Sequence, residues 1–144
     1  MYKSKWFTLK ELVSPAVYQK FGDFAWNFLD KGMLKDNDLL RDLWGKALFI
    51  NTWGFGGQYK ESGFRCNTDS IVKAKKIPYC SAHVLGRGFD IKPELIEDVP
   101  KLYELIKLNF HKFSTVSRME NIKCTPTWIH WDNLEDRSNK IIIF

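Results

Sequence analysis

Hydrophobic and polar positions divide the chain into a helical first third and a remainder that predicts strands around one long helix. In the first third, Thr8 and Glu11 form a capping-box pattern that predicts a short helix, and Pro15 suits the first turn of a second helix. The apolar segment 23–29 follows, and residues 38–44 predict a third helix that ends at Gly45. We expect these helices to support a sheet.

In the remainder, a short apolar run at 47–51 predicts the first strand, and residues 53–57 and 68–78 predict loops. Pro93 is expected to open a helical stretch that carries one amphipathic face. Segments 113–120 and 127–132 predict two strands joined by a turn, and 141–144 predicts a last short strand. This order predicts an α+β fold, a single domain over residues 1–144, with an antiparallel sheet packed with helices. The amphipathic face consists of Val99, Leu102, Tyr103, Ile106 and Phe110.

The composition agrees with one globular domain, because 44% of the 144 residues are hydrophobic and six are tryptophan. No apolar run reaches the roughly 18 residues of a membrane span. The basic N-terminus has no apolar segment behind it, so we expect no signal peptide and synthesis in the cytoplasm. Three scattered cysteines with no C-x-x-C pair predict reduced thiols rather than a cysteine metal site.

The net charge of +5 favours anionic partners such as a bacterial cell wall or nucleic acid. The lysines are dispersed, and no known nucleic-acid-binding motif accompanies them. Nucleic acid is therefore not an expected partner, and a monomer is expected.

Candidate chemistry lies in the stretch 81–90, where His83 and Asp90 flank Gly86 and Gly88 among apolar residues. A buried imidazole and a buried carboxylate need partners or a metal, because polar burial without compensation is costly. Glycines let the backbone turn sharply, which would bring the two side chains to one point.

A second candidate stretch, 127–132, has the alternation of a strand, so His130 and Asp132 point to one side and Trp131 to the other. His83, Asp90 and His130 make a suitable three-ligand set for Zn²⁺ and leave a fourth coordination position open. A hydrogen-bonded core histidine with a capping aspartate fits the same spacing, and spacing alone leaves both interpretations open.

The motif Ser81-x-His83-x-x-Gly86-x-Gly88-x-Asp90 resembles the S-x-H-x-x-G-x-A-x-D signature of the D-Ala-D-Ala zinc peptidase superfamily. This superfamily includes vancomycin-resistance dipeptidases, phage endolysin peptidases and the hedgehog signalling domain. The 130–132 segment is similar to the H-x-D strand of its small phage branch, and the segment 62–65 is similar to the S-G-Y-R segment of the family. The resemblance covers about residues 49–132, with glycine at 88 where the family usually has alanine.

The resemblance implies a hedgehog/D-Ala-D-Ala peptidase-like fold, zinc as the cofactor, and His83, Asp90 and His130 as its ligands. It also implies that Ser81 binds substrate. Arg65 suits stabilisation of an oxyanion or binding of a substrate carboxylate.

Hydrolysis also needs a general base. The family often places this carboxylate three residues before the last histidine, where this chain has Thr127. Glu120, on the preceding strand, is the first candidate for this base. Its alternative role is structural, as an ion-pair partner of Arg118 or a lysine. Asp132 is the second candidate, but its displacement along the strand favours a role in orienting a ligand.

The implied function is zinc-dependent hydrolysis of peptidoglycan stem peptides, at D-Ala-D-Ala or L-Ala-D-Glu bonds, by a phage endolysin or a virion-associated peptidase acting at the cell wall. The alternative is a zinc-bearing binding module of the same fold that does not catalyse, as hedgehog domains exemplify. The missing carboxylate at position 127 favours this alternative.

Overall fold

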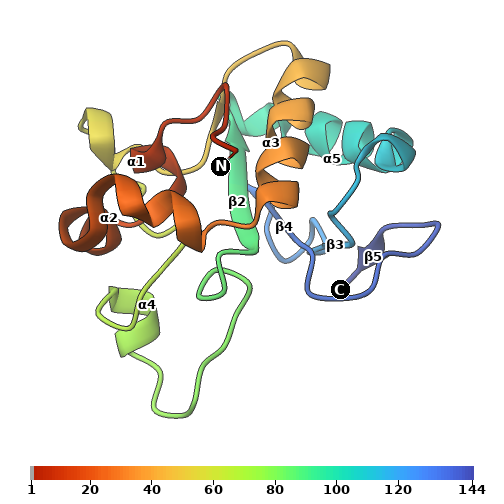
Figure 1. Cartoon of the computed structure of the whole chain (residues 1–144). Helices are drawn as coiled ribbons and strands as arrows, with labels where there is room; N and C mark the ends of the chain where they lie inside the picture. The colour runs from red at the N-terminus through yellow and green to blue at the C-terminus, as the bar shows by residue number, and fades with distance from the viewer. Residues whose placement is uncertain (1) are drawn as a thin grey trace.

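The computed structural model describes residues 2–144 as one α+β domain built on a five-stranded mixed sheet (Figure 1). Its helices are α1 (Leu9–Leu12), α2 (Pro15–Phe21), α3 (Lys31–Trp44), α4 (Ser70–Lys73) and α5 (Val99–Leu108), with short 3₁₀ helices at Gly22–Phe28, Trp53–Phe55, Ile96–Asp98 and Phe110–Lys112. Its strands are β1 (Leu48–Phe49), β2 (Gly88–Pro93), β3 (Arg118–Met119), β4 (Ile129–Asp132) and β5 (Ile142–Ile143).

The strand order is β1-β2-β4-β3-β5, and every neighbouring pair is antiparallel except β3 and β5. The prediction of an antiparallel sheet is therefore wrong for the last pair. Both edges of β4 are already occupied, by β2 and β3. The chain reverses after β4 and pairs β5 with the free edge of β3, so β5 runs in the same direction as β3.

Local sequence signals explain where the first helices begin and end. The capping box of Thr8 and Glu11 opens α1, and the side chain of Ser14 caps α2 with Pro15 in its first turn. Helix α3 begins at residue 31 rather than 38, because Asp30 caps it by accepting a hydrogen bond from Met33. It ends as predicted at Gly45, which has a left-handed backbone with φ of 72°.

Two strand and helix boundaries differ from the predictions. Pro93 ends strand β2 instead of opening a helix, and α5 begins at Val99, with Pro100 in its first turn. Strand β3 spans two residues of the predicted segment 113–120. The five residues of the predicted amphipathic face are buried, but Phe110 lies in the 3₁₀ helix that follows α5 rather than in α5 itself.

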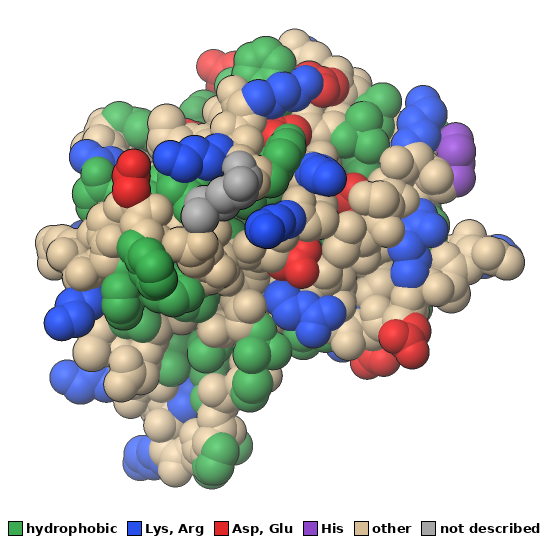
Figure 2. Space-filling view, viewed as in Figure 1, with side chains coloured by type: hydrophobic (Ala, Val, Ile, Leu, Met, Phe, Trp, Pro, Cys, Tyr) green, Lys and Arg blue, Asp and Glu red, His purple; other side chains and the backbone are tan. Residues whose placement is uncertain are grey.

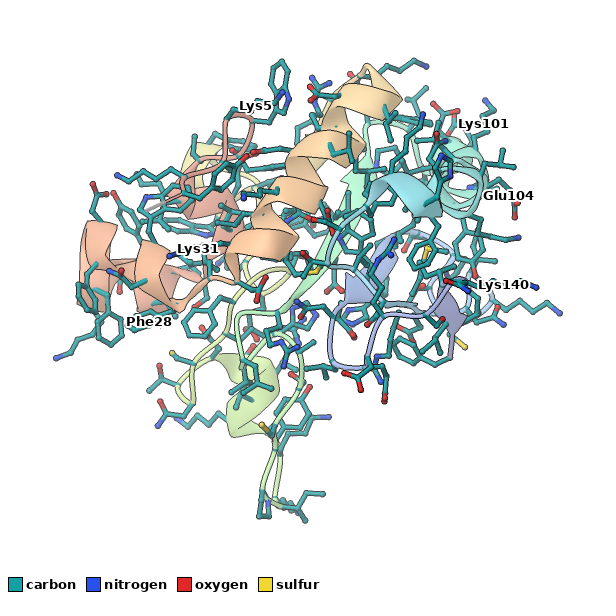
Figure 3. All side chains as sticks on the ribbon, turned by 45° about the vertical axis from the view of Figure 1, so that its right-hand side comes forward. Lys5, Phe28, Lys31, Lys101, Glu104 and Lys140 are labelled. Carbon is teal, nitrogen blue, oxygen red and sulfur yellow. The ribbon has the colours of Figure 1, made fainter. Side chains whose placement is uncertain are left out.

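The sheet has one apolar face and one polar face. Phe89, Ile91, Met119, Ile129 and Trp131 alternate toward the core and are buried. Helix α3 packs on this face, where the Trp131 indole donates a hydrogen bond to Asn37. Charged side chains of α5 such as Lys101 and Glu104 point outward (Figure 3). Because side chains alternate along a strand, residues 88, 90 and 92 of β2 and residues 130 and 132 of β4 face away from the core.

Lysines and arginines are scattered over the face seen in Figure 2 and are interspersed with acidic side chains. This dispersal matches the sequence pattern and gives no dense basic patch on that face. In the described part of the chain, no helix is both long and apolar enough to cross a membrane.

Asp36 on α3 links this helix by hydrogen bonds to the segment before β3. Asp36 is 2% exposed, and its carboxylate accepts hydrogen bonds from the backbone N–H groups of Ser114, Thr115 and Val116 at 2.9, 2.7 and 2.7 Å. Three donors from one turn thus depend on a single buried acceptor.

We expect Asp36→Ala to lower the free energy of unfolding by about 3 kcal/mol or more, because several buried donors lose their partner. Asp23→Ala, at an exposed position, is the control and should change stability by less than about 0.5 kcal/mol. Chemical denaturation of both variants measures the effect, and equal stabilities would contradict this role of Asp36.

Candidate metal centre

Three side chains from separate parts of the chain converge on the polar face of the sheet: His83, Asp90 and His130. Asp90 Oδ1 lies 2.8 Å from His130 Nδ1 and 3.2 Å from His83 Nε2, and the two histidine nitrogens are 3.2 Å apart. All three side chains are largely buried. This group could hold a metal ion.

The spacing of the three atoms suits one small cation. In a tetrahedral zinc site with bonds of about 2.0–2.1 Å, neighbouring ligand atoms lie about 3.3–3.4 Å apart. The observed triangle of 2.8, 3.2 and 3.2 Å is close to one face of such a tetrahedron. The donor set of two imidazoles and one carboxylate therefore fits zinc in type and in spacing.

Strand pairing places two of the ligands. In the register between β2 and β4, Asp90 is directly opposite His130. The next residue outward is Glu120, just beyond β3, whose backbone N–H donates to the His130 carbonyl at 2.9 Å. Asp90, His130 and Glu120 thus form a row across three chain segments. Side chains paired in this way are close neighbours on one face.

The third ligand comes from the turn before β2. Gly86 has φ of 68°, and a Cβ there would meet the Phe28 carbonyl oxygen at 2.0 Å, so this turn requires glycine. His83 Nδ1 lies 2.9 Å from the Gly63 carbonyl oxygen. A carbonyl only accepts, so Nδ1 carries the proton and leaves Nε2 free toward the other two ligands.

Asp132 fixes the second histidine in the opposite tautomer. His130 Nε2 lies 3.1 Å from Asp132 Oδ2, so its N–H donates there and Nδ1 faces Asp90. Asp132 is fully buried and also accepts two hydrogen bonds from Arg118, at 2.8 and 2.9 Å, and one from the Leu134 N–H at 3.0 Å. Each histidine therefore presents one unprotonated nitrogen to the same point when neutral.

The protonation of the centre follows from these contacts. Burial lowers the pKa of His83. For His130, burial also favours the neutral form, but hydrogen bonds to Asp132 and Asp90 outweigh it and raise the pKa to about 9. The pKa of Asp90 is held well below its ordinary value because both histidines offset the cost of burial. Without a metal, His130 is the protonated member at neutral pH.

The remaining predicted site residues surround this centre in two ways. Arg65 lies beside Asp90 and also lines the cavity over the centre; its Nη2 donates to Asp90 Oδ2 at 3.2 Å and its Nε donates to the Glu61 carbonyl. Ser81 and Glu120 line a cavity of about 440 Å³ over the centre. The Ser81 hydroxyl is buried and has no hydrogen-bond partner among residues 2–144.

The Glu120 carboxylate makes no hydrogen bond or ion pair within the described residues. Arg118, the partner that could have occupied it, pairs with Asp132 and with Glu135. The polar face of the sheet therefore carries, beside His130, the carboxylate of Glu120 without a partner among the described residues.

Close packing around Gly88 leaves no room for a larger residue. A Cβ at this position would lie 2.5 Å from Ala82 Cβ and 3.4 Å from Asp132 Cβ. The turn that carries His83 therefore packs directly against β2 at this glycine.

Sequence reasoning missed the Gly63 carbonyl and Lys92, and it considered Arg118 as a partner of Glu120, whereas Arg118 pairs with Asp132 and Glu135. The amine of Lys92 is buried near Asp90, and burial lowers its pKa to about 8. Period-two alternation from Asp90 would have placed Lys92 on the polar face, but nothing local indicated its partners.

No protein-family model, curated protein or solved structure matches this chain. The centre is therefore interpreted from its own geometry.

We expect one zinc ion per chain in the wild type, and loss of stoichiometric zinc in His130→Ala, because a three-ligand site loses a third of its donors. His111→Ala, which removes an exposed histidine, is the control and should keep full occupancy. Metal analysis after dialysis measures this, and full occupancy in His130→Ala would rule out the ligand set.

Metal affinity should depend on pH through His130. A ligand nitrogen must lose its proton, so apparent affinity should rise about tenfold per pH unit up to about pH 9 and then level off. Asp132→Asn removes a carboxylate that raises this pKa, so its plateau should begin at lower pH. Calorimetric titrations at several pH values measure the effect, and a wild-type affinity equal at pH 7 and 9 would contradict it.

Proposed function

We propose that this chain is a zinc-dependent peptidase that hydrolyses peptidoglycan stem peptides. The observation that carries the proposal is the triangle of His83, Asp90 and His130 beside an unengaged carboxylate, Glu120, in the same row of the sheet. A three-ligand metal with an open position and a neighbouring base is the arrangement that metal-assisted hydrolysis needs. When bound, the metal polarises a carbonyl and lowers the pKa of water toward neutrality.

Glu120 is the better candidate for the general base. It lies opposite His130 and lines the cavity over the centre, so it can take a proton from an attacking water. Asp132 already accepts four hydrogen bonds, and these contacts lower its pKa to about 2 against the effect of burial. Asp132 therefore holds His130 in position and is poorly suited to take up a proton.

Ser81 and Arg65 have different relations to substrate in this proposal. The buried Ser81 hydroxyl lacks a partner, and a peptide in the cavity would supply one. Arg65 forms an ion pair with Asp90, so its first role is to balance the charge of this metal ligand. Its guanidinium also lines the cavity, so in this proposal it contacts a substrate oxyanion or carboxylate as well.

The substrate class rests on the resemblance to D-Ala-D-Ala-type zinc peptidases, with cleavage at D-Ala-D-Ala or L-Ala-D-Glu bonds. The net charge of +5 supports an anionic target such as a cell wall. A phage endolysin or a virion-associated wall peptidase fits this combination.

A zinc-bearing binding module is the second candidate, and Thr127 is the observation that favours it. This residue occupies the position of the family's usual base, and it is exposed in the turn before β4. In that case Glu120 would have no role in turnover.

The test is to incubate the zinc-loaded protein with purified muropeptides and to identify products by mass. Cleavage that stops on chelation and returns with zinc is the expected result. A protein that holds its zinc and leaves every muropeptide intact would overturn the hydrolase proposal and favour the binding module.

Glu120→Gln should lower the rate of hydrolysis by about 10²–10⁴ while zinc content and folding stay near wild type, because it removes only the base. Asp132→Asn should instead weaken zinc affinity by about 10–100-fold and recover in part with excess zinc. Rates measured with and without excess zinc separate the two. Full activity in Glu120→Gln, with an inactive but zinc-loaded Asp132→Asn, would reverse the assignment.

A further inference from the structure

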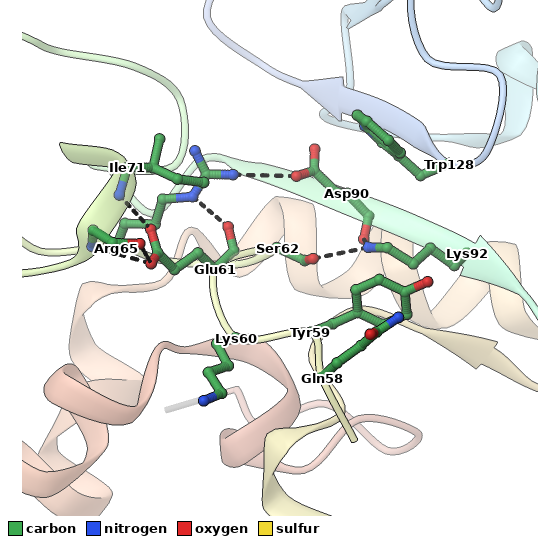
Figure 4. A pocket seen from close by; sticks show the side chains of 11 residues that line it. Gln58, Tyr59, Lys60, Glu61, Ser62, Arg65, Ile71, Asp90, Lys92 and Trp128 are labelled. Carbon is green, nitrogen blue, oxygen red and sulfur yellow. Dashed lines mark hydrogen bonds and ion pairs between the residues drawn. The ribbon is translucent and has the colours of Figure 1, made fainter. Parts of the chain in front are cut away.

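A second cavity, of about 550 Å³, adjoins the metal centre and shares Arg65, Asp90 and Trp128 with the first (Figure 4). We call it the Lys92 cavity, after the lysine that extends into it. The two cavities therefore meet at the ligand Asp90.

Lys92 lies on the same face of β2 as Asp90, about 6–7 Å further along the strand. It is 7% exposed, and its amine donates to Ser62 Oγ at 2.8 Å and to the Asp90 and Ile50 carbonyl oxygens at 3.2 and 3.5 Å. The ring of Tyr59 lies 4.5 Å from the amine.

This buried amine has only uncharged acceptors. No carboxylate among residues 2–144 lies within ion-pair distance of it, because Asp90 faces Arg65 and His130, and Glu61 faces Ser70 and Ile71. Burying a cation without an anion is costly, and a partner charge recovers much of that cost. The cavity thus contains a positive charge that no carboxylate of the described residues contacts directly. Its N–H groups go to three neutral acceptors, and the Ile50 carbonyl at 3.5 Å is the most distant of them and the one that a carboxylate could replace.

We propose that the Lys92 cavity is the subsite for a substrate carboxylate located one or two residues from the cleaved bond, with Lys92 as the residue that selects it. The position of the amine supports this, because Nζ lies 3.2 Å from the carbonyl oxygen of the metal ligand Asp90, and a peptide residue spans about 3.3 Å in extended form. Ser62 Oγ accepts from Lys92, so its own proton is free to donate to the same carboxylate. The aromatic side chains of Tyr59 and Trp128 supply walls for the peptide.

The proposal rests on the proposed function but can be tested by binding alone. The probes are the tripeptide L-Ala-γ-D-Glu-L-Lys and its counterpart with the D-Glu α-carboxylate amidated, together with D-Ala-D-Ala and its C-terminal amide. Binding to the zinc-loaded protein is followed by tryptophan fluorescence with a calorimetric check, and cleavage is measured separately by mass.

Wild type should bind one carboxylate probe about 10- to 100-fold more tightly than its amide, the usual range for a hydrogen bond to a charged group. Lys92→Met should abolish this ratio. Lys73→Met, which removes an exposed lysine of α4, should keep it. Lys92→Gln serves as a second variant that retains polar contacts if Lys92→Met folds poorly.

Equal binding of acid and amide in the wild type would overturn the subsite, and so would a ratio that survives in both Lys92 variants. If the wild type discriminates through Lys92 but cleaves neither peptide, the subsite stands and the hydrolase proposal fails. The two failures are therefore distinguishable.

Discussion

The register of β4 between its neighbours is the constraint on which the site depends. It places His130 opposite Asp90 on one side and next to Glu120 on the other. A slip of one residue would turn His130 into the core and Trp131 out of it. Trp131 is fully buried and hydrogen-bonded to Asn37 of α3, so core packing holds the register that assembles the ligands.

The polar face depends on charge balance as much as on packing. Asp132 is fully buried, and Arg118, His130 and a backbone N–H satisfy its carboxylate. Asp90 is similarly balanced by Arg65 and two histidines. A half-satisfied network of this kind would be costly. The contacts that stabilise the buried charges also fix both imidazole tautomers. The same hydrogen bonds therefore contribute to stability and to the geometry of the ligands.

Part of this arrangement follows from local sequence. The alternation around His130 predicts which side chains leave the core, and the glycines near His83 indicate the turn that brings it to Asp90. The capping box at Thr8 and the end of α3 at Gly45 are also local features, and the structure confirms both predictions.

The rest depends on contacts between distant segments, which no local pattern encodes. Arg118 pairs with Asp132 because of strand register, and β5 is parallel to β3 because both edges of β4 are already occupied. Helix α3 begins at residue 31 because the Asp30 side chain caps it by accepting a hydrogen bond from the Met33 N–H. Lys92 could be placed on the polar face by periodicity, but only the assembled cavity shows that no carboxylate among residues 2–144 contacts its amine.

The central claim is that His83, Asp90 and His130 bind one metal ion through the three atoms that converge here. A crystal structure of the zinc-loaded protein, with anomalous data collected at the zinc edge, tests it most directly. The account predicts a single strong peak about 2.0–2.2 Å from His83 Nε2, His130 Nδ1 and Asp90 Oδ1. A zinc-loaded crystal with no peak at this position, or with zinc bound to other side chains, would contradict it.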